Sequence, residues 1–78
     1  MTLEIISAED VVFTGEVEAV TLPGSLGSFT VLKNHAPIIS VLTAGTIYYR
    51  TPQGEANSYG IKGGLVDVNS NKIAVCIY

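Results

Sequence analysis

Residues 65–77 read LVDVNSNKIAVCI, and this stretch decides the fold class. Two short runs rich in β-branched residues, 65–68 and 72–77, flank the turn-forming group Asn69-Ser70-Asn71. The second run carries apolar residues at every second position, Ile73, Val75 and Ile77. Because successive side chains of a strand point to opposite faces, these three share one face. The stretch therefore predicts a β-hairpin with one apolar face.

The same pattern extends outward to the rest of the chain, and no helical 3.6-residue period appears anywhere in it. Short runs rich in β-formers alternate with Gly, Pro and Asn turn signals throughout. The strands expected are 3–7, 11–13, 16–22, 28–32, 38–42, 46–51, 56–61, 65–68 and 72–77. This spacing predicts an all-β fold, a flattened antiparallel β-sandwich or barrel of about ten short strands.

Three local features refine this prediction. Pro23–Gly27 and Lys33–Pro37 read as loops, and Gly63-Gly64 as a bulge or tight corner. In the expected strand 16–22, Glu16 and Glu18 lie on one face, with Val17 and Ala19 on the other.

Length and composition indicate one domain, residues 1–78, with 47% hydrophobic residues and only 14% charged. The usual charged fraction is about 25%. The surface is therefore either covered by a partner or formed largely by uncharged polar residues such as Thr, Ser and Asn. The net charge is −3 and no basic stripe exists, which argues against nucleic-acid binding. A single cysteine allows no internal disulfide and fits a reducing compartment.

We expect no secretory signal and no direct membrane insertion. Glu4 lies near the start without a basic segment before it, and no apolar run approaches the roughly 20 residues that a membrane-spanning helix needs. Any association with a membrane is therefore expected to go through a protein partner.

Candidate catalytic groups are few. Cys76 is the only cysteine and lies in an apolar strand, where a thiol usually serves as inert filling. His35, the only histidine, precedes Ala36-Pro37 in a loop and is expected to bond a neighbouring carbonyl, contact a partner or play no role. Glu16 and Glu18 could act as paired carboxylates but fit an ordinary solvated face better. No metal or cofactor site is predicted.

Many short motifs follow one another along the whole chain. They are Ser7-Ala8-Glu9, Phe13-Thr14-Gly15-Glu16-Val17, Leu22-Pro23-Gly24, Gly27, Val31-Leu32, His35-Ala36-Pro37, Gly45, Gly63-Gly64-Leu65, Val68 and Ile73–Ile77. No single motif is specific, but in their order and spacing the chain resembles the ATP synthase epsilon subunit family.

The resemblance implies a ten-stranded β-sandwich and a non-catalytic rotor role in the central stalk of a rotary, proton-transporting ATP synthase. In this family the sandwich binds the gamma subunit and rests on the c-ring, coupling ring rotation to ATP synthesis. The implied location is peripheral, on the cytoplasmic face of a bacterial plasma membrane, with no cofactor.

The resemblance also implies site residues. The loop Gly24, Ser25, Leu26, Gly27, Ser28 and Phe29 corresponds to the ring-facing loop, and His35, Ala36, Pro37 and Ile38 to a segment at the gamma–ring junction. Many members carry acidic residues in the ring-facing loop, where this chain has Leu26 and Ser28. Phe29 could instead be a core residue, because it shares a face with Val31.

The family usually adds a carboxy-terminal helical hairpin that can inhibit ATP hydrolysis and, in some members, bind ATP. This chain ends at Tyr78, where the sandwich ends. Either the protein is naturally short or the sequence has been shortened, and without a hairpin we expect neither helix-mediated inhibition nor nucleotide binding.

Two other functions compete with the adaptor role. A carbohydrate- or ligand-binding sandwich would need an exposed aromatic cluster, but the adjacent Tyr48 and Tyr49 point to opposite faces. A small hydrolase would need a nucleophile beside a base, and none is evident. The adaptor role is therefore the preferred prediction.

Overall fold

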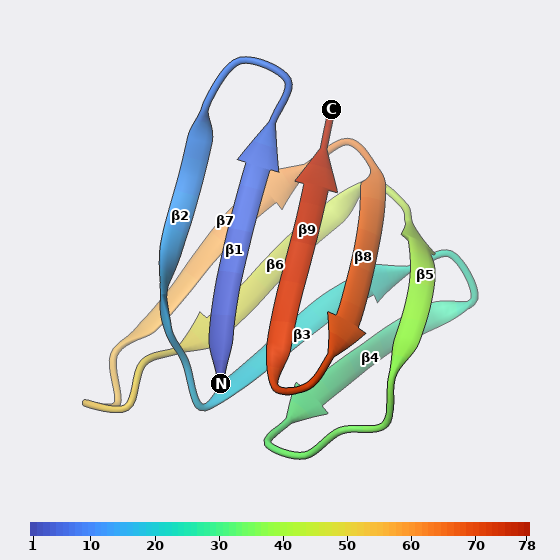
Figure 1. The fold of residues 1–78 in the computed structure, drawn as a ribbon. Coiled ribbons are helices and arrows are strands. Elements are labelled where there is room, and N and C mark those ends of the chain that lie inside the picture. The colour runs from blue at the N-terminus through green and yellow to red at the C-terminus, as the bar shows by residue number, and fades with distance from the viewer.

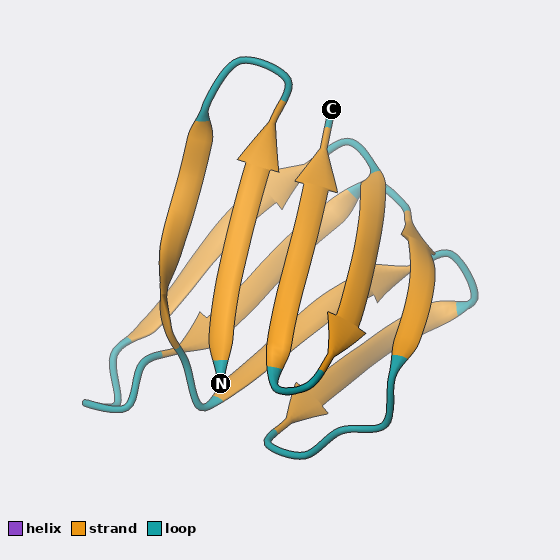
Figure 2. Cartoon of the chain, in the orientation of Figure 1, coloured by secondary structure: helices purple, strands orange, loops and turns teal.

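Nine β-strands form two packed layers in the computed structural model, which describes residues 1–78 (Figure 1). The strands are β1 (Thr2–Ser7), β2 (Val11–Glu16), β3 (Ala19–Gly24), β4 (Gly27–Leu32), β5 (Ile38–Leu42), β6 (Gly45–Arg50), β7 (Ala56–Ile61), β8 (Gly64–Asn69) and β9 (Lys72–Ile77). The all-β prediction is confirmed (Figure 2). No helix is present, so none is long and apolar enough to cross a membrane.

The layers are a five-stranded sheet, β2-β1-β9-β8-β5, and a four-stranded sheet, β7-β6-β3-β4. A single residue pair, Gly24 with Leu42, joins β3 to β5 and links the two sheets along one edge. Figure 1 shows the five-stranded sheet in front and the four-stranded sheet crossing behind it. The fold is therefore a β-sandwich nearly closed on one side.

The core lies between the sheets and consists of 14 buried hydrophobic residues. Strands of both layers supply it at alternate positions, for example Ile73 and Val75 from β9 and Val20 and Leu22 from β3. No polar or charged side chain is buried. Since each fully buried aliphatic side chain stabilises the fold by about 1.5–3 kcal/mol, this alternation holds the two layers together.

The predicted hairpin at residues 65–77 is confirmed as β8 and β9, which pair antiparallel. Its two turn residues, Ser70 and Asn71, have φ angles of 51° and 59°. Positive φ at both central residues is the geometry of the hairpin turn that matches strand twist, and Asn tolerates it well.

One strand pair departs from the predicted antiparallel arrangement. Strands β1 and β9 run parallel, with Leu3 opposite Ile73 and Ile5 opposite Val75. Neighbouring strands joined by a short turn must be antiparallel, but β1 and β9 stand at opposite ends of the chain, so no turn fixes their direction. Packing of the layers decides it instead.

The expected single strand 16–22 is also wrong. Strand β2 ends at Glu16, and the Val17–Glu18 link carries the chain to β3 in the other sheet. This link changes which alternate positions face the core. Val17 is buried, but two residues later Ala19 points outward, and Val20 points inward. Glu16 and Glu18 therefore do not form a pair on one strand face, and Glu18 lies instead 3.4 Å from the Arg50 guanidinium.

One predicted turn is tighter than expected, and one predicted corner is confirmed. Pro23 and Gly24 belong to β3 and Gly27 to β4, which leaves only Ser25 and Leu26 in the turn. Gly63-Gly64 is a tight corner, as predicted, where the chain passes from β7 in the four-stranded sheet to β8 in the five-stranded sheet.

Candidate protein-interaction surface

An apolar row crosses the outer face of the five-stranded sheet. The pairing registers place Val41 opposite Leu65, Leu65 opposite Cys76, and Cys76 opposite Ile6. After a register shift between Ile5 and Ile6, Ile6 lies opposite Val11. Directly opposite residues on one sheet face stand about 5 Å apart, so these five side chains form one continuous band. We call this band the apolar row.

Four of the five residues of the apolar row are exposed to solvent, and Ile6 is half-buried. Val11, Val41 and Leu65 are 57%, 55% and 46% exposed, and Ile39 beside the row is 70% exposed. Isolated exposed hydrophobic residues are ordinary, but a contiguous band rimmed by polar residues marks an interaction site. Sequence reasoning missed this band, because its members come from five different strands.

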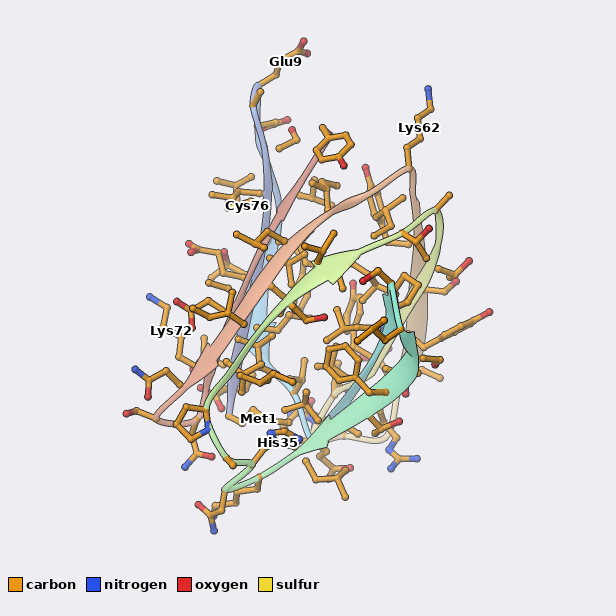
Figure 3. The ribbon with its side chains drawn as sticks, turned by 90° about the vertical axis from the view of Figure 1, so that its right-hand side faces the viewer. Met1, Glu9, His35, Lys62, Lys72 and Cys76 are labelled. Carbon is orange, nitrogen blue, oxygen red and sulfur yellow. The ribbon has the colours of Figure 1, made fainter.

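Cys76 lies in the middle of the apolar row, and its thiol is exposed rather than used as core filling. The expectation of a buried cysteine was therefore wrong. Ile73, Val75 and Ile77 point inward, so the alternate positions Lys72 and Cys76 must point outward. The two-residue alternation of this strand in the sequence already indicated that Cys76 faces outward. In Figure 3, Lys72 lies on the outer side of the sheet.

The predicted ring-facing segment Gly24–Phe29 forms the β3–β4 turn and its flanks. Leu26, at the tip, is fully exposed at 103%. The turn is attached to the end of β5, because the amide of Ser25 donates to the carbonyl of Val41 at 2.9 Å and the amide of Thr43 to the carbonyl of Pro23 at 2.8 Å. Leu26 is thus exposed at the tip of a turn whose backbone is hydrogen-bonded to the end of β5.

Phe29 packs against the core from the inner face of β4, together with the buried Val31. Its ring also touches Gly24, where a methyl group added to the glycine would lie only 2.9 Å from the ring edge. Of the two interpretations of Phe29, a ring-contact residue or a core residue, the structure favours the core residue. Ser25, Leu26, Gly27 and Ser28 are the exposed members of the segment.

The predicted segment His35–Ile38 leads into β5. The amide of His35 donates to the carbonyl of Leu32 at 3.1 Å, and His35 Nδ1 lies 2.6 Å from the carbonyl oxygen of Ala36. This matches the expected bond to a neighbouring carbonyl. Ala36 and Pro37 are exposed, whereas Ile38 is half-buried against the core.

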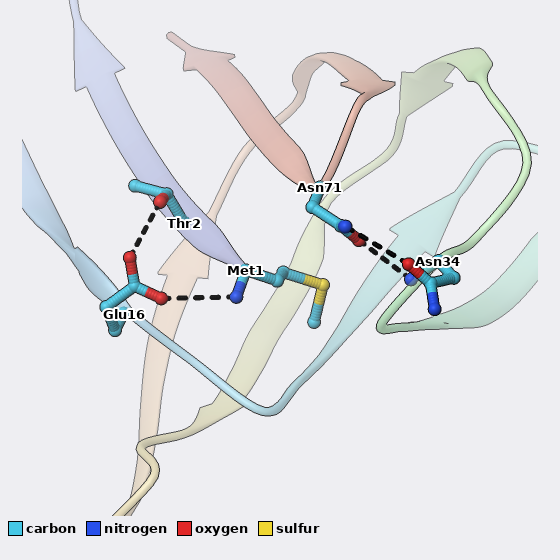
Figure 4. Close-up of polar contacts among 5 residues, drawn as sticks. All are labelled: Met1, Thr2, Glu16, Asn34 and Asn71. Carbon is cyan, nitrogen blue, oxygen red and sulfur yellow. Dashed lines mark hydrogen bonds and ion pairs between the residues drawn. The ribbon is translucent and has the colours of Figure 1, made fainter.

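Hydrogen bonds between Asn34 and Asn71 hold the loop that contains this segment (Figure 4). The Asn34 amide donates to Asn71 Oδ1 at 2.7 Å, and Asn71 Nδ2 donates to Asn34 Oδ1 at 3.1 Å. The carbonyl of Asn71 also accepts from the amide of Thr2 at 3.0 Å. The β4–β5 loop, the β8–β9 turn and the start of β1 are therefore bound to one another.

The two predicted segments do not meet. The Ser25–Leu26 turn is bonded to the last residues of β5, and His35–Ile38 precedes its first residues. Ile39 and Val41 lie between them and face outward. The candidate surface is consequently the β5 edge with an exposed turn at one end, an exposed loop at the other, and the apolar row running across the sheet.

The outer face of the four-stranded sheet differs. It has a shallow hollow of about 330 Å³ lined by Thr21, Thr30, Leu32 and Tyr48, among others. The prediction that the side chains of Tyr48 and Tyr49 point to opposite faces of the sheet is confirmed. Tyr48 is 56% exposed, whereas Tyr49 packs inward with its ring centroid 4.5 Å from that of Phe13.

The remaining candidate groups stand apart. His35 lies at the end of the molecule that also holds Met1, whereas Cys76 lies toward the opposite end, at the second-last position of β9 (Figure 3). Glu16 accepts from Thr2 Oγ1 at 2.9 Å and from the amino terminus of Met1 at 3.1 Å. The structure contains no group of three or more His, Cys, Asp or Glu placed to hold a metal ion.

Comparison with known proteins identifies relatives along nearly the whole chain. The ATP synthase epsilon chain of a Nitratiruptor species is 38% identical over 77 residues, which are 99% of this chain and 60% of that protein. The ATP synthase epsilon chain of Desulfitobacterium hafniense is 40% identical over 74 residues, 95% of this chain and 55% of that protein. The chain thus spans little more than half the length of these relatives.

Solved structures share the fold. A chain in the cryo-EM structure of the Euglena gracilis mitochondrial ATP synthase (OSCP/F1/c-ring) matches with a TM-score of 0.89 at 23% identity, over 96% of this chain and 48% of that chain. One in the Tetrahymena thermophila mitochondrial ATP synthase (central stalk/c-ring) matches with a TM-score of 0.82 at 13% identity, over 97% and 61%. The family model for the ATP synthase delta/epsilon chain β-sandwich domain matches residues 1–77. The chain therefore belongs to the family of ATP synthase delta/epsilon chain β-sandwich domains.

Proposed function

We propose that this chain is a non-catalytic rotor subunit of a proton-transporting ATP synthase, binding the gamma subunit and the c-ring and transmitting rotation between them. Family membership gives the role, and one observation carries it to this molecule: the apolar row on the outer face of the five-stranded sheet. In this role the chain is held at the cytoplasmic face of the membrane by its partners and needs no cofactor of its own.

The size of the molecule supports a sheet face as the gamma-binding surface. The total accessible surface is 4638 Å². A stable interface buries roughly 800 Å² on each partner, which is about a sixth of that total. The outer face of one sheet, with the apolar row crossing it near one end of the strands, can supply such an area.

The β5 edge supports the ring contact. Leu26 at one end of β5 and Ala36-Pro37 at the other are exposed, while hydrogen bonds hold the backbone behind each of them. A close-packed interior resists deformation, so a force applied at this edge is transmitted through the sandwich to the opposite strands. We assign Gly24–Phe29 to the ring contact through its exposed members, and His35–Ile38 to the junction.

A matched pair of substitutions tests the proposal. Val41 and Leu32 are exposed to nearly the same extent, 55% and 57%, but lie on the outer faces of different sheets. We expect Val41→Glu to weaken binding to a soluble catalytic assembly that contains gamma and lacks epsilon by about tenfold or more. Leu32→Glu should change the affinity by about twofold or less. Titration calorimetry or surface plasmon resonance measures both.

Cys76 provides an independent readout, since it is exposed at the centre of the apolar row. A maleimide should alkylate it readily in the free chain and far more slowly in the complex with the gamma-containing assembly. A folded wild-type chain that fails to bind, or a complex in which Cys76 reacts as fast as in the free chain, would contradict the proposed surface.

A further inference from the structure

Two carboxylates interrupt the outer face of the five-stranded sheet directly beside the apolar row. The registers place Asp67 between Ile39 and Ala74, and Ala74 beside Glu4. Because neighbouring strands are about 4.8 Å apart, Asp67 and Glu4 flank Ala74 at a backbone separation of about 10 Å. The alanine side chain is small, so the space between the two acids is open.

Neither acid has a partner within the molecule. The ion pairs of the structure are Met1 with Glu16 and Arg50 with Glu18, and no side-chain hydrogen bond involves Glu4 or Asp67. Lys72 shares the face but stands one row away, directly opposite Asn69 and Thr2. Lys72 lines the same hollow as Asp67 and Ala74 but bonds neither acid. The face therefore carries two carboxylates without a bonded partner next to its most apolar part.

This arrangement restricts what can dock there. A carboxylate that is covered by an apolar surface loses its hydration without compensation, which disfavours binding unless the partner supplies a charge or a hydrogen bond. An apolar partner without a cation is penalised, and an acidic one is repelled. A long basic side chain entering above Ala74 can reach either acid, and a guanidinium can bond a carboxylate through two parallel N–H groups.

We propose that Asp67, assisted by Glu4, recognises a basic side chain on the gamma-subunit surface that covers the apolar row, and that this pairing determines which partner the face accepts. The inference rests on the proposed function and adds the chemistry of recognition to it. A second copy of this chain is a poorer occupant, because stacking two such faces would oppose Asp67 and Glu4 of one copy with the acids of the other.

Isosteric neutralisation tests this assignment. Asp67→Asn keeps the shape of the side chain and removes one negative charge, whereas Glu55→Gln removes the same charge from the exposed β6–β7 loop of the other sheet. With the 78-residue chain and the gamma-containing assembly lacking epsilon, Asp67→Asn should lower affinity about tenfold or more. Glu55→Gln should leave it within about twofold. Asp67→Lys should abolish measurable binding.

Salt provides a second readout. Wild-type affinity should fall as ionic strength rises, and the double variant Asp67→Asn, Glu4→Gln should lose most of that dependence. Thermal melting of each variant checks the fold, which an exposed position should leave intact. If Asp67→Asn keeps the wild-type affinity and the wild-type dependence on salt, while Val41→Glu still weakens binding, this inference is overturned and the proposed function stands. Absence of wild-type binding, or a self-dimer broken by Val41→Glu, would overturn both.

Discussion

At the scale of one residue, Glu16 shows how an exposed carboxylate can still be held by two hydrogen-bond donors. Its oxygens accept from the Thr2 hydroxyl and from the amino terminus, across the β1–β2 pair. The Thr2 hydrogen bond, then the hydrogen bond and charge of the amino terminus, lower the pKa of Glu16 below its usual value. All three causes favour the ionised form in the folded state.

The lowered pKa predicts a pH-dependent contribution to stability. A carboxyl whose pKa is lower in the folded state stabilises the fold above its unfolded pKa, and that contribution is lost as the pH falls through the folded pKa. Glu16→Gln should therefore lower the melting temperature at neutral pH, and the gap from wild type should narrow as the pH falls below the ordinary glutamate pKa. Glu9→Gln, in the exposed β1–β2 loop, is the control. A gap that widens in acid would contradict the pKa direction.

The corner between β7 and β8 illustrates the scale of the element. Gly64 is buried and begins β8 directly opposite Ile77, so that β8 and β9 approach each other without an intervening side chain. A Cβ on Gly64 would collide with the carbonyl oxygen of Cys76 and with the Cα of Ile77, both of which are backbone atoms. Neither can rotate away, so the pairing of the hairpin depends on this glycine.

Gly64→Ala should accordingly destabilise the protein by about 1–3 kcal/mol, the usual cost of overpacking a core. Gly60→Ala is the matched control, because a Cβ there meets nothing within 4 Å and the position lies on exposed β7. It should change the free energy of unfolding by less than about 0.5 kcal/mol. Urea denaturation of both variants measures the difference, and equal losses would show that the corner has room to adjust.

At the scale of the whole molecule, two surfaces meet at β5, one for each proposed partner. The apolar row extends from Val41 across the five-stranded sheet, and the Ser25–Leu26 turn projects from the end of the same strand. Leu26 buries nothing within the molecule, since it is 103% exposed. It can therefore be altered without disturbing either sheet, which separates the two proposed contacts experimentally.

Leu26→Asp should reduce retention of the chain on purified c-rings by about tenfold, because the substitution charges the exposed apolar tip of the ring-facing turn. Its affinity for the gamma-containing assembly should be unchanged, and its melting temperature should stay near the wild-type value. Gln53→Asp, in the exposed β6–β7 loop, introduces the same side chain elsewhere. Equal loss of ring retention in both variants would remove Leu26 from the ring contact.

The ring-facing and junction segments came from family resemblance, whereas the apolar row and the Asp67–Glu4 pair came only from the structure. Even a correct strand assignment for residues 38–42 and 65–68 does not reveal that Val41 stands opposite Leu65. Such a relation depends on register between strands more than twenty residues apart in the sequence. Cys76 is the exception, because the alternation of β9 alone placed it outward.

The sequence by itself determined most of the local elements: all strands except the one expected at 16–22, their hairpin turns and the inward positions of β8 and β9. Those properties follow from the two-residue period of an extended backbone and from turn residues that tolerate positive φ. Only the tertiary structure decided the parallel β1–β9 pair, the change of phase at Val17–Glu18 and the surface assembled from five strands. The reason is physical, because pairing between distant strands is selected by packing two layers around one core, and no local pattern specifies which partner satisfies it.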